Sequence, residues 1–181
     1  MRNRHTKINK GFTLIETLVA IAVLMIAIAG PLTVANKALM AALYARDQSI
    51  ASYLALETME IVRDIKNNNP SSGFLNNLGG GISCLLDNGK CDYGTVSGTR
   101  GSLQTTCASS IGCQIYLDNA AGYNNQSTGN STVFYRYFYL TATNNPADPN
   151  DYTLTVVVTW KEGTVTDEIR MRAELINIRQ A

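Results

Sequence analysis

The segment that decides the fold is Lys10-Gly11-Phe12-Thr13-Leu14-Ile15-Glu16, together with the apolar run that follows it over residues 17–36. That run, TLVAIAVLMIAIAGPLTVAN, has twenty residues and none of them is charged. As a helix it would measure about 30 Å, the thickness of the hydrocarbon core of a bilayer. Basic residues precede it at Arg2, Arg4, Lys7 and Lys10. Because positive flanks stay in the cytoplasm, the sequence predicts one membrane span with its N-terminal end inside.

Two simpler interpretations of this span are a plain membrane anchor and a secretory signal peptide. Ala27-Ile28-Ala29, followed by Gly30, has the small-x-small shape of a signal-peptidase site. Glu16 argues against the signal peptide, since a carboxylate deep in lipid costs roughly 2.5–3.5 kcal/mol and a signal peptide has no use for it. The interpretation to prefer is one that gives Glu16 a role.

Residues 10–16 resemble the processing site of the type IV prepilins and the type II secretion pseudopilins. The shared features are a basic leader, a Gly-Phe pair, a glutamate at this offset and an apolar run of the right length. The resemblance implies that a membrane aspartic peptidase cleaves after Gly11 on the cytoplasmic side and that the new N-terminal residue, Phe12, is N-methylated. Glu16 would be the family's glutamate, which pairs with the N-terminus of a neighbouring subunit during assembly. In a low-dielectric setting such an amine and carboxylate neutralise each other, which offsets much of the cost of burial.

Cleavage would change the charge of the chain. The 181-residue precursor has 15 Lys+Arg and 14 Asp+Glu, a net charge of +1. Loss of the four basic leader residues leaves 11 against 14, a net charge of −3 on a 170-residue mature chain. Nucleic-acid binding is therefore not expected, although Arg136 among tyrosines is a pattern found in single-strand stacking sites. The only histidine, His5, lies in the leader, so imidazole chemistry is excluded and we expect no enzyme, catalytic residue, metal or cofactor.

The helical pattern continues over residues 37–66. Apolar residues recur in one stripe and a flanking ridge: Leu43, Ile50, Leu54, Ile61 and Ile65, then Tyr44, Ala51, Ala55, Met59 and Val62. Asn67-Asn68-Asn69-Pro70 is expected to end the helix, because proline cannot continue it. Gly30-Pro31 predicts a kink within it, and the family resemblance implies that the helix melts there in a filament.

Parts of this second helical half resemble one branch of the family, the V-type minor pilins and the I-type minor pseudopilins. The segments concerned are residues 44–48, 53–57 and 60–66. This resemblance implies a minor subunit, which primes or caps a fibre, rather than the major one.

Residues 67–131 are rich in Gly, Asn and Ser and are predicted to be loops that bury little apolar area. Two short apolar islands, residues 82–86 and 114–117, could pair as strands. The four cysteines Cys84, Cys91, Cys107 and Cys113 lie here, on the extracytoplasmic side. Their even number favours disulfides, and three pairings are open. Because short loops close most easily, the pairs that are near in sequence, Cys84–Cys91 and Cys107–Cys113, are favoured. A four-thiolate zinc site is the alternative, for which the spacings are poor.

Residues 132–181 are predicted to form an antiparallel sheet. Alternating apolar positions give strands at 133–142, 152–161 and 165–175, the last two joined by a turn at Glu162-Gly163. Phe134, Phe138, Leu140 and Ala142 share one face of the first strand, and Tyr135, Tyr137 and Tyr139 share the other. The aromatic cluster is expected to pack against residues 43–65, with a tyrosine-lined contact surface for neighbouring subunits as the alternative. The predicted fold class is α+β: a long N-terminal α-helix, transmembrane in its first half, on about four antiparallel strands.

The function expected from these features is structural. The organisation would be a leader (1–11), a transmembrane and filament-core helix (12–36), an amphipathic second half (37–66), the cysteine-containing loops (67–131) and the sheet (132–181). The expected partners are other pilin subunits, the prepilin peptidase and methylase, the membrane and a pilus or secretion assembly platform. The fibre would serve adhesion, motility, DNA uptake or secretion. The alternative is a single-pass, membrane-anchored binding module that never polymerises.

Overall fold

The computed structural model describes most of the chain. The described residues are 11–68, 74, 78, 84–85, 90–93, 95–96, 99–100, 103, 107, 112–119, 122–127, 129–143 and 151–176. The chain divides into two compact units, residues 1–45 and residues 46–181. The expected leader lies outside the described residues except for Gly11, and so does Pro70.

The first unit contains the beginning of helix α1, Leu14–Asn68. Its apolar side chains are exposed, and the helix is long and apolar enough to span a membrane. Helical structure continues through Gly30 and Pro31 in this structure. Next to them, the Thr33 hydroxyl donates hydrogen bonds to the carbonyl oxygens of Gly30 (2.7 Å) and Ala29 (3.2 Å). The kink expected at Gly30-Pro31 remains a prediction.

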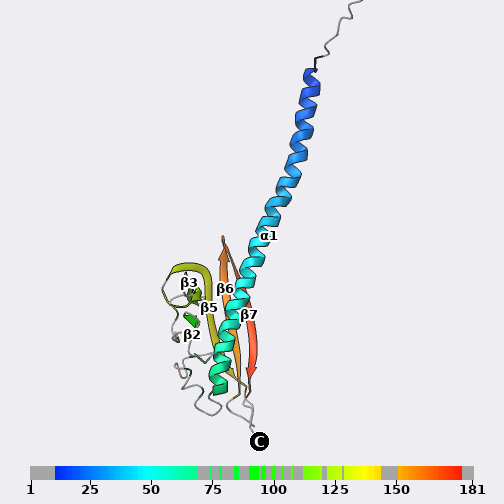
Figure 1. The fold of residues 1–181 in the computed structure, drawn as a ribbon. Helices are drawn as coiled ribbons and strands as arrows, with labels where there is room; N and C mark the ends of the chain where they lie inside the picture. The colour runs from blue at the N-terminus through cyan, green and yellow to red at the C-terminus, as the bar shows by residue number, and fades with distance from the viewer. Residues whose placement is uncertain are drawn as a thin grey trace, which may run out of the picture. The chain divides into compact units, whose positions relative to one another are not determined.

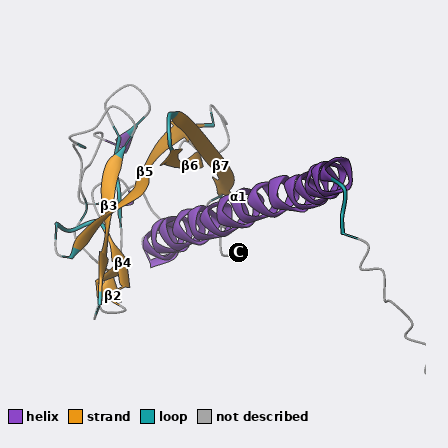
Figure 2. Cartoon of the chain, turned by 90° about the horizontal axis from the view of Figure 1, so that it is seen from above, coloured by secondary structure: helices purple, strands orange, loops and turns teal. Residues whose placement is uncertain are grey.

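The second unit contains the rest of α1 and a five-stranded antiparallel sheet of order β4-β3-β5-β6-β7 (Figures 1 and 2). The strands are β3 (Cys113–Asp118), β4 (Gly122–Asn124), β5 (Asn130–Ala142), β6 (Tyr152–Glu162) and β7 (Val165–Leu175). Two further strands, β1 (Thr95–Val96) and β2 (Thr99–Arg100), pair with each other as a separate two-stranded sheet. The expected α+β class is confirmed, with five strands in the main sheet where about four were predicted.

One side of α1 packs on the sheet. Its buried residues, spaced by three and four, are Ala51, Leu54, Ala55, Thr58, Met59, Val62, Ile65 and Lys66. The centre of this side runs between the two predicted apolar rows, so Ile50 and Ile61 are only partly buried. Thr58 and Lys66 are polar members that the apolar pattern does not reveal. The Lys66 ammonium lies 5.1 Å from the centre of the Phe74 ring and 5.8 Å from that of Tyr152, so its charge is stabilised by cation–π interactions with both rings.

Strands β5, β6 and β7 form a meander in which each strand pairs along most of its length. Phe134 lies opposite Trp160, and Val158 lies opposite Ile169. The turn between β6 and β7 contains Gly163 with φ of 60°, a left-handed conformation that glycine adopts without strain. The predicted hairpin at the C-terminus is therefore present. Burial in β6 is not confined to one face, however, since Thr155, Val157 and Thr159 are at most 6% exposed, while Val165 at the start of β7 is exposed.

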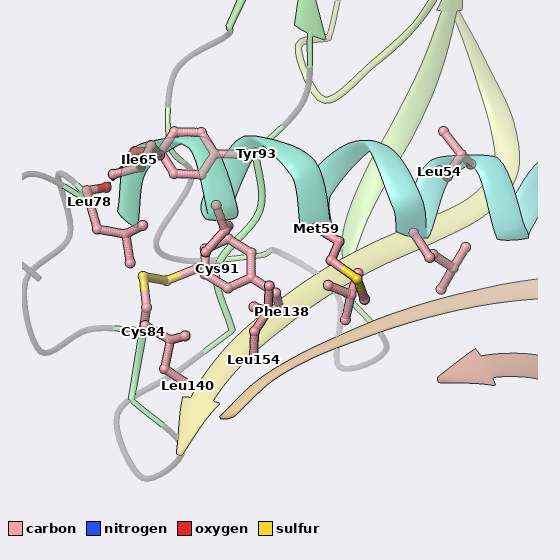
Figure 3. Close-up of a cluster of buried hydrophobic side chains, with 14 of the residues drawn as sticks. Leu54, Met59, Ile65, Leu78, Cys84, Cys91, Tyr93, Phe138, Leu140 and Leu154 are labelled. Atoms are coloured by element: carbon pink, nitrogen blue, oxygen red, sulfur yellow. Dashed lines mark hydrogen bonds between the residues drawn. A yellow bond between two sulfur atoms is a disulfide. The ribbon is translucent and has the colours of Figure 1, made fainter. Parts of the chain in front are cut away.

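The region between helix and sheet differs from the expectation of loops with little buried area. Strands β3 and β4 belong to the main sheet, and several side chains from the connecting segments are in the core. The apolar ones before β3 that are at most 5% exposed are Phe74, Leu78, Cys84, Cys91 and Tyr93. Figure 3 shows Leu78, Cys84, Cys91 and Tyr93 beside Ile65 of α1 and Phe138, Leu140 and Leu154 of the sheet. The composition of this region did not reveal that role, because the few apolar residues that fill the core are spaced irregularly along the sequence.

Two disulfide bonds close short loops in this region. They join Cys84 to Cys91, with Cα atoms 5.4 Å apart, and Cys107 to Cys113, with Cα atoms 4.5 Å apart. These are the two pairs that sequence proximity favours, and both separations are usual for disulfides. All four thiols of the zinc alternative are engaged in these bonds. Among the residues that the structure describes, no three His, Cys, Asp or Glu side chains gather as metal ligands.

Candidate functional site

The start of α1 is organised by Thr13 and Glu16. The Thr13 carbonyl accepts hydrogen bonds from the backbone N–H groups of Glu16 (3.1 Å) and Thr17 (3.2 Å), and its hydroxyl oxygen accepts a longer one from Glu16 N–H (3.4 Å). Thr-x-x-Glu is the sequence pattern of a capping box, and a carboxylate in the first turn also interacts favourably with the helix dipole. The helix therefore begins at Leu14, and residues 11–13 precede it as non-helical chain.

Gly11 and Phe12 are accessible in this arrangement. Phe12 is 80% exposed, and a Cβ atom added to Gly11 would have no atom within 4 Å. The peptide bond between them lies outside the helix, where backbone hydrogen bonding does not protect it. The two residues and Glu16 thus lie within six consecutive positions at one end of the helix. Their roles in cleavage, methylation and assembly remain predictions.

The helix that follows presents apolar side chains on all its sides. Those at least 55% exposed between Leu14 and Met40 are Leu14, Ile15, Leu18, Val19, Ile21, Val23, Leu24, Met25, Ile26, Ile28, Leu32, Val34, Leu39 and Met40. Glu16 is the only charged residue of the helix before Lys37. So much apolar surface is not stable in water and requires lipid or other protein around it. When lipid or protein surrounds this part of the helix, Glu16 is the charged group that needs a polar partner.

An apolar helix of membrane length and an α+β domain with two disulfides point to a membrane-anchored protein as the class. Residues 6–30 match the family model for the prokaryotic N-terminal methylation motif. The chain is accordingly type IV prepilin-like, and proteins with this motif are processed by a peptidase and are structural rather than enzymatic. No curated protein and no solved structure gives a significant match.

A group of buried polar side chains around Arg136, in the unit of residues 46–181, was not predicted from the sequence. Arg136 of β5 is fully buried. Its guanidinium donates to Asp92 Oδ1 at 2.6 Å and Oδ2 at 3.3 Å, and to Glu57 Oε2 at 2.6 Å. It also donates to the carbonyl oxygens of Leu54 (2.9 Å) and Tyr93 (2.6 Å). We call these five residues the Arg136 cluster; it joins α1, residues 92–93 and β5.

The electrostatics of the cluster depend on Arg136. Burial raises the pKa of Asp92, and the adjacent guanidinium opposes this rise without cancelling it. For Arg136, burial alone would lower the pKa, but the carboxylates of Asp92 and Glu57 outweigh burial, so the pKa is raised above its ordinary value. Asp92 is therefore a costly buried carboxylate whose main compensation is Arg136. The suggested single-strand stacking role for Arg136 is wrong, because its side chain faces the core and is inaccessible to a nucleic acid.

The tyrosines of β5 lie on the opposite face from Arg136. Tyr135, Tyr137 and Tyr139 are each partly exposed, whereas Phe134, Phe138 and Leu140 are buried on the helix side. The rings of Tyr137 and Tyr139 stack with centres 6.3 Å apart, and the Lys90 ammonium lies 4.3 Å from the centre of the Tyr137 ring. Core packing against α1 therefore accounts for the phenylalanines but not for the tyrosines. The tyrosine-lined contact surface remains a prediction.

Proposed function

We propose that this protein is a minor subunit of a type IV pilus-like or pseudopilus filament, cleaved after Gly11 and assembled through the first part of α1. The observation that carries this proposal is the uncovered apolar helix with Glu16 as its single early charge, directly after the methylation motif. The subunit would first be a single-pass protein of the cytoplasmic membrane and then part of an extracytoplasmic filament. The minor rather than major role is supported by the resemblance of residues 44–66 to the V-type and I-type branch.

The assembly step follows from the chemistry of the helix end. Cleavage after Gly11 creates an α-amine on Phe12, which methylation leaves able to carry charge. The amine of one subunit would neutralise Glu16 of its neighbour when both leave the lipid. Moving the apolar side chains from lipid to filament changes their surroundings little, so close packing and this ion pair would set the register. Glu16 is thereby given the role that a plain anchor does not supply.

The Gly30-Pro31 step is proposed as the point where the helix adapts during assembly. Pro31 lacks the N–H that would bond the carbonyl of Ala27, and Gly30 adds backbone freedom. The hydroxyl of Thr33 already bonds the carbonyl oxygens of residues 29 and 30, so part of the local backbone has an alternative partner. A filament reconstruction should show extended chain within residues 26–34. An unbroken helix over these residues in the filament would exclude the proposal.

Cleavage is tested by N-terminal sequencing and intact mass of the protein from cells with and without the prepilin peptidase. We expect a mature start at N-methylated Phe12, whereas an intact Met1 would indicate the plain anchor and a start at Gly30 the secreted form. Gly11→Val is expected to abolish cleavage. Because a side chain at position 11 meets no atom within 4 Å, this loss would reflect peptidase recognition and not misfolding. Gly30→Val, which also meets no atom there, is the control and should be cleaved normally.

Assembly is tested with Glu16→Gln, which keeps the shape of the side chain and removes its charge. We expect membrane insertion and cleavage to continue while the subunit disappears from sheared filament or pseudopilus fractions. Thr17→Val, one residue further along the same turn, is the control and should be incorporated. If Glu16→Gln were incorporated as well as the unmodified chain, the assembly role of Glu16 would be wrong. If neither the unmodified chain nor the Thr17→Val variant entered a filament in the presence of the assembly machinery, the non-polymerising binding module would be favoured.

A further inference from the structure

Two disulfide-bonded segments cover the same edge of β5, one after the other. Strand β3 pairs with β5 as far as Arg136, which lies opposite Cys113. Immediately beyond, Cys91 continues the pairing: its N–H donates to Phe138 O at 3.1 Å, and its carbonyl accepts from Phe138 N–H at 2.6 Å. The edge of β5 next to Arg136 is thus occupied by cysteines from both bridges. The position of the Cys91 segment consequently matters for what surrounds Arg136.

The two residues after Cys91 accept three of the five hydrogen bonds that Arg136 donates. Asp92 contributes both carboxylate oxygens, and Tyr93 contributes its carbonyl oxygen. The same Tyr93 carbonyl accepts a hydrogen bond from Thr58 of α1 at 2.8 Å. Residues 92–93 therefore connect the helix with β5 in the interior of the domain. If they moved away, Arg136 would retain only Glu57 among its acidic partners.

The two bridges differ in how they could be reached by a reductant. Cys84 and Cys91 are both 0% exposed, and Figure 3 shows their sulfur–sulfur bond among the core side chains Leu78, Phe138 and Leu140. Cys107 is partly exposed. Small thiols can therefore approach the Cys107–Cys113 bridge in the folded domain, whereas the Cys84–Cys91 bridge is protected until the core opens.

We propose that the Cys84–Cys91 bond is an oxidation-dependent latch, which holds Asp92 against Arg136 and so fixes the second half of α1 on the sheet. To close it, the two thiols pass two electrons and two protons to a disulfide oxidant, which becomes a dithiol. A dithiol such as dithiothreitol reverses the step and is itself converted to a cyclic disulfide. In the open state residues 90–93 leave the edge of β5, and α1 loses its hydrogen bond from Thr58 to the Tyr93 carbonyl.

A double-mutant cycle on the full-length chain in detergent micelles tests this coupling. Asp92→Asn is made in the unmodified chain, in a Cys84→Ala/Cys91→Ala chain and in a Cys107→Ala/Cys113→Ala chain. The last is a matched control, because its bridge spans six positions where the other spans seven, so loop-closure entropy is nearly equal. We expect Asp92→Asn to lower the folding equilibrium constant at least about a hundredfold in the unmodified and control chains. Without the Cys84–Cys91 bridge the effect should shrink to less than about threefold. Equal effects in all three chains would overturn the latch.

A second measurement covers the case in which the Cys84→Ala/Cys91→Ala chain does not fold. Coupling between two sites is reciprocal, so loss of Asp92 must make the bridge easier to reduce. The unmodified, Asp92→Asn and Glu168→Gln chains are equilibrated with dithiothreitol, alkylated and analysed by peptide mass. In Asp92→Asn the reduced-to-oxidised ratio should rise at least about tenfold more at Cys84–Cys91 than at Cys107–Cys113. The exposed-residue control Glu168→Gln should change neither ratio. A Cys84–Cys91 ratio that Asp92→Asn leaves unchanged, or raises no more than that of the other bridge, would refute the proposal.

Discussion

Replacement of Arg136 by methionine is expected to destabilise the domain of residues 46–181 by about 4–6 kcal/mol. Methionine is close in length and fills much of the same volume, so the change removes mainly the charge and its donors. Asp92 is fully buried and loses the guanidinium that pairs with it, which by itself costs about 3–5 kcal/mol. Glu57 is 22% exposed and can turn toward water, so the loss of its ion pair with Arg136 adds little to the destabilisation. The carbonyl oxygen of Tyr93 keeps Thr58 as a donor, which limits the backbone contribution to about 1 kcal/mol.

The assay is equilibrium denaturation of the full-length chain in micelles, with a signal from Trp160, which is 1% exposed in the folded core. Arg170→Met on the neighbouring part of the sheet is the control. Its ion pair with Glu168 is exposed at both ends, so its loss should change the stability by no more than about 1 kcal/mol. If Arg136→Met also lowered the stability by no more than about 1 kcal/mol, the view that Asp92 depends on Arg136 would be refuted. Adding Asp92→Leu to Arg136→Met should recover most of the loss, since the unpaired charge is then gone.

Two further predictions concern backbone strain and pH. Gly129→Ala should destabilise the domain by about 3 kcal/mol, because φ is 92° and the new Cβ would lie 2.4 Å from the carbonyl oxygen of Leu117. Gly122→Ala, with φ of 71° and no atom within 4 Å, should cost only about 1–2 kcal/mol in the same denaturation assay; equal losses would contradict the contact with Leu117. Burial raises the pKa values of Tyr137 and Tyr152 above 10.0, so the folded state holds these protons more tightly than the unfolded state does. This stabilisation is fully present below pH 10.0 and is lost as the pH rises through the folded-state pKa values. In a titration followed by tyrosinate absorbance, Tyr137→Phe and Tyr152→Phe should each remove a group that ionises late. If either substitution removed an early-ionising group instead, the argument from burial would be wrong.

The N-terminal helix and the C-terminal strands could be predicted because their patterns are local. The apolar run over residues 17–36 is long, uncharged and preceded by basic residues, which identifies the span without tertiary information. The alternation over residues 152–175 likewise fixes which side chains share a face. The segments between helix and sheet carry no such period. Leu78 and Tyr93 are core residues because the Tyr93 hydroxyl donates to the Leu78 carbonyl and its ring stacks on Phe138, contacts that depend on the folded chain.

Arg136 marks the limit of the local pattern most clearly. Alternation along β5 places it on the same face as Phe134 and Phe138, so its burial follows from the sequence once the strand is assigned. A buried guanidinium then requires acidic partners and carbonyl oxygens, since an unpaired charge would not be tolerated in the core. What the alternation cannot provide is the identity of those partners: Glu57 is 79 positions away on the helix, and Asp92 is 44 positions away in a segment without periodicity. An arginine that falls on the apolar face of a strand is therefore a signal to search distant loops for a carboxylate partner. The first carboxylate to examine is one that follows a cysteine able to close a short disulfide loop, as Asp92 follows Cys91.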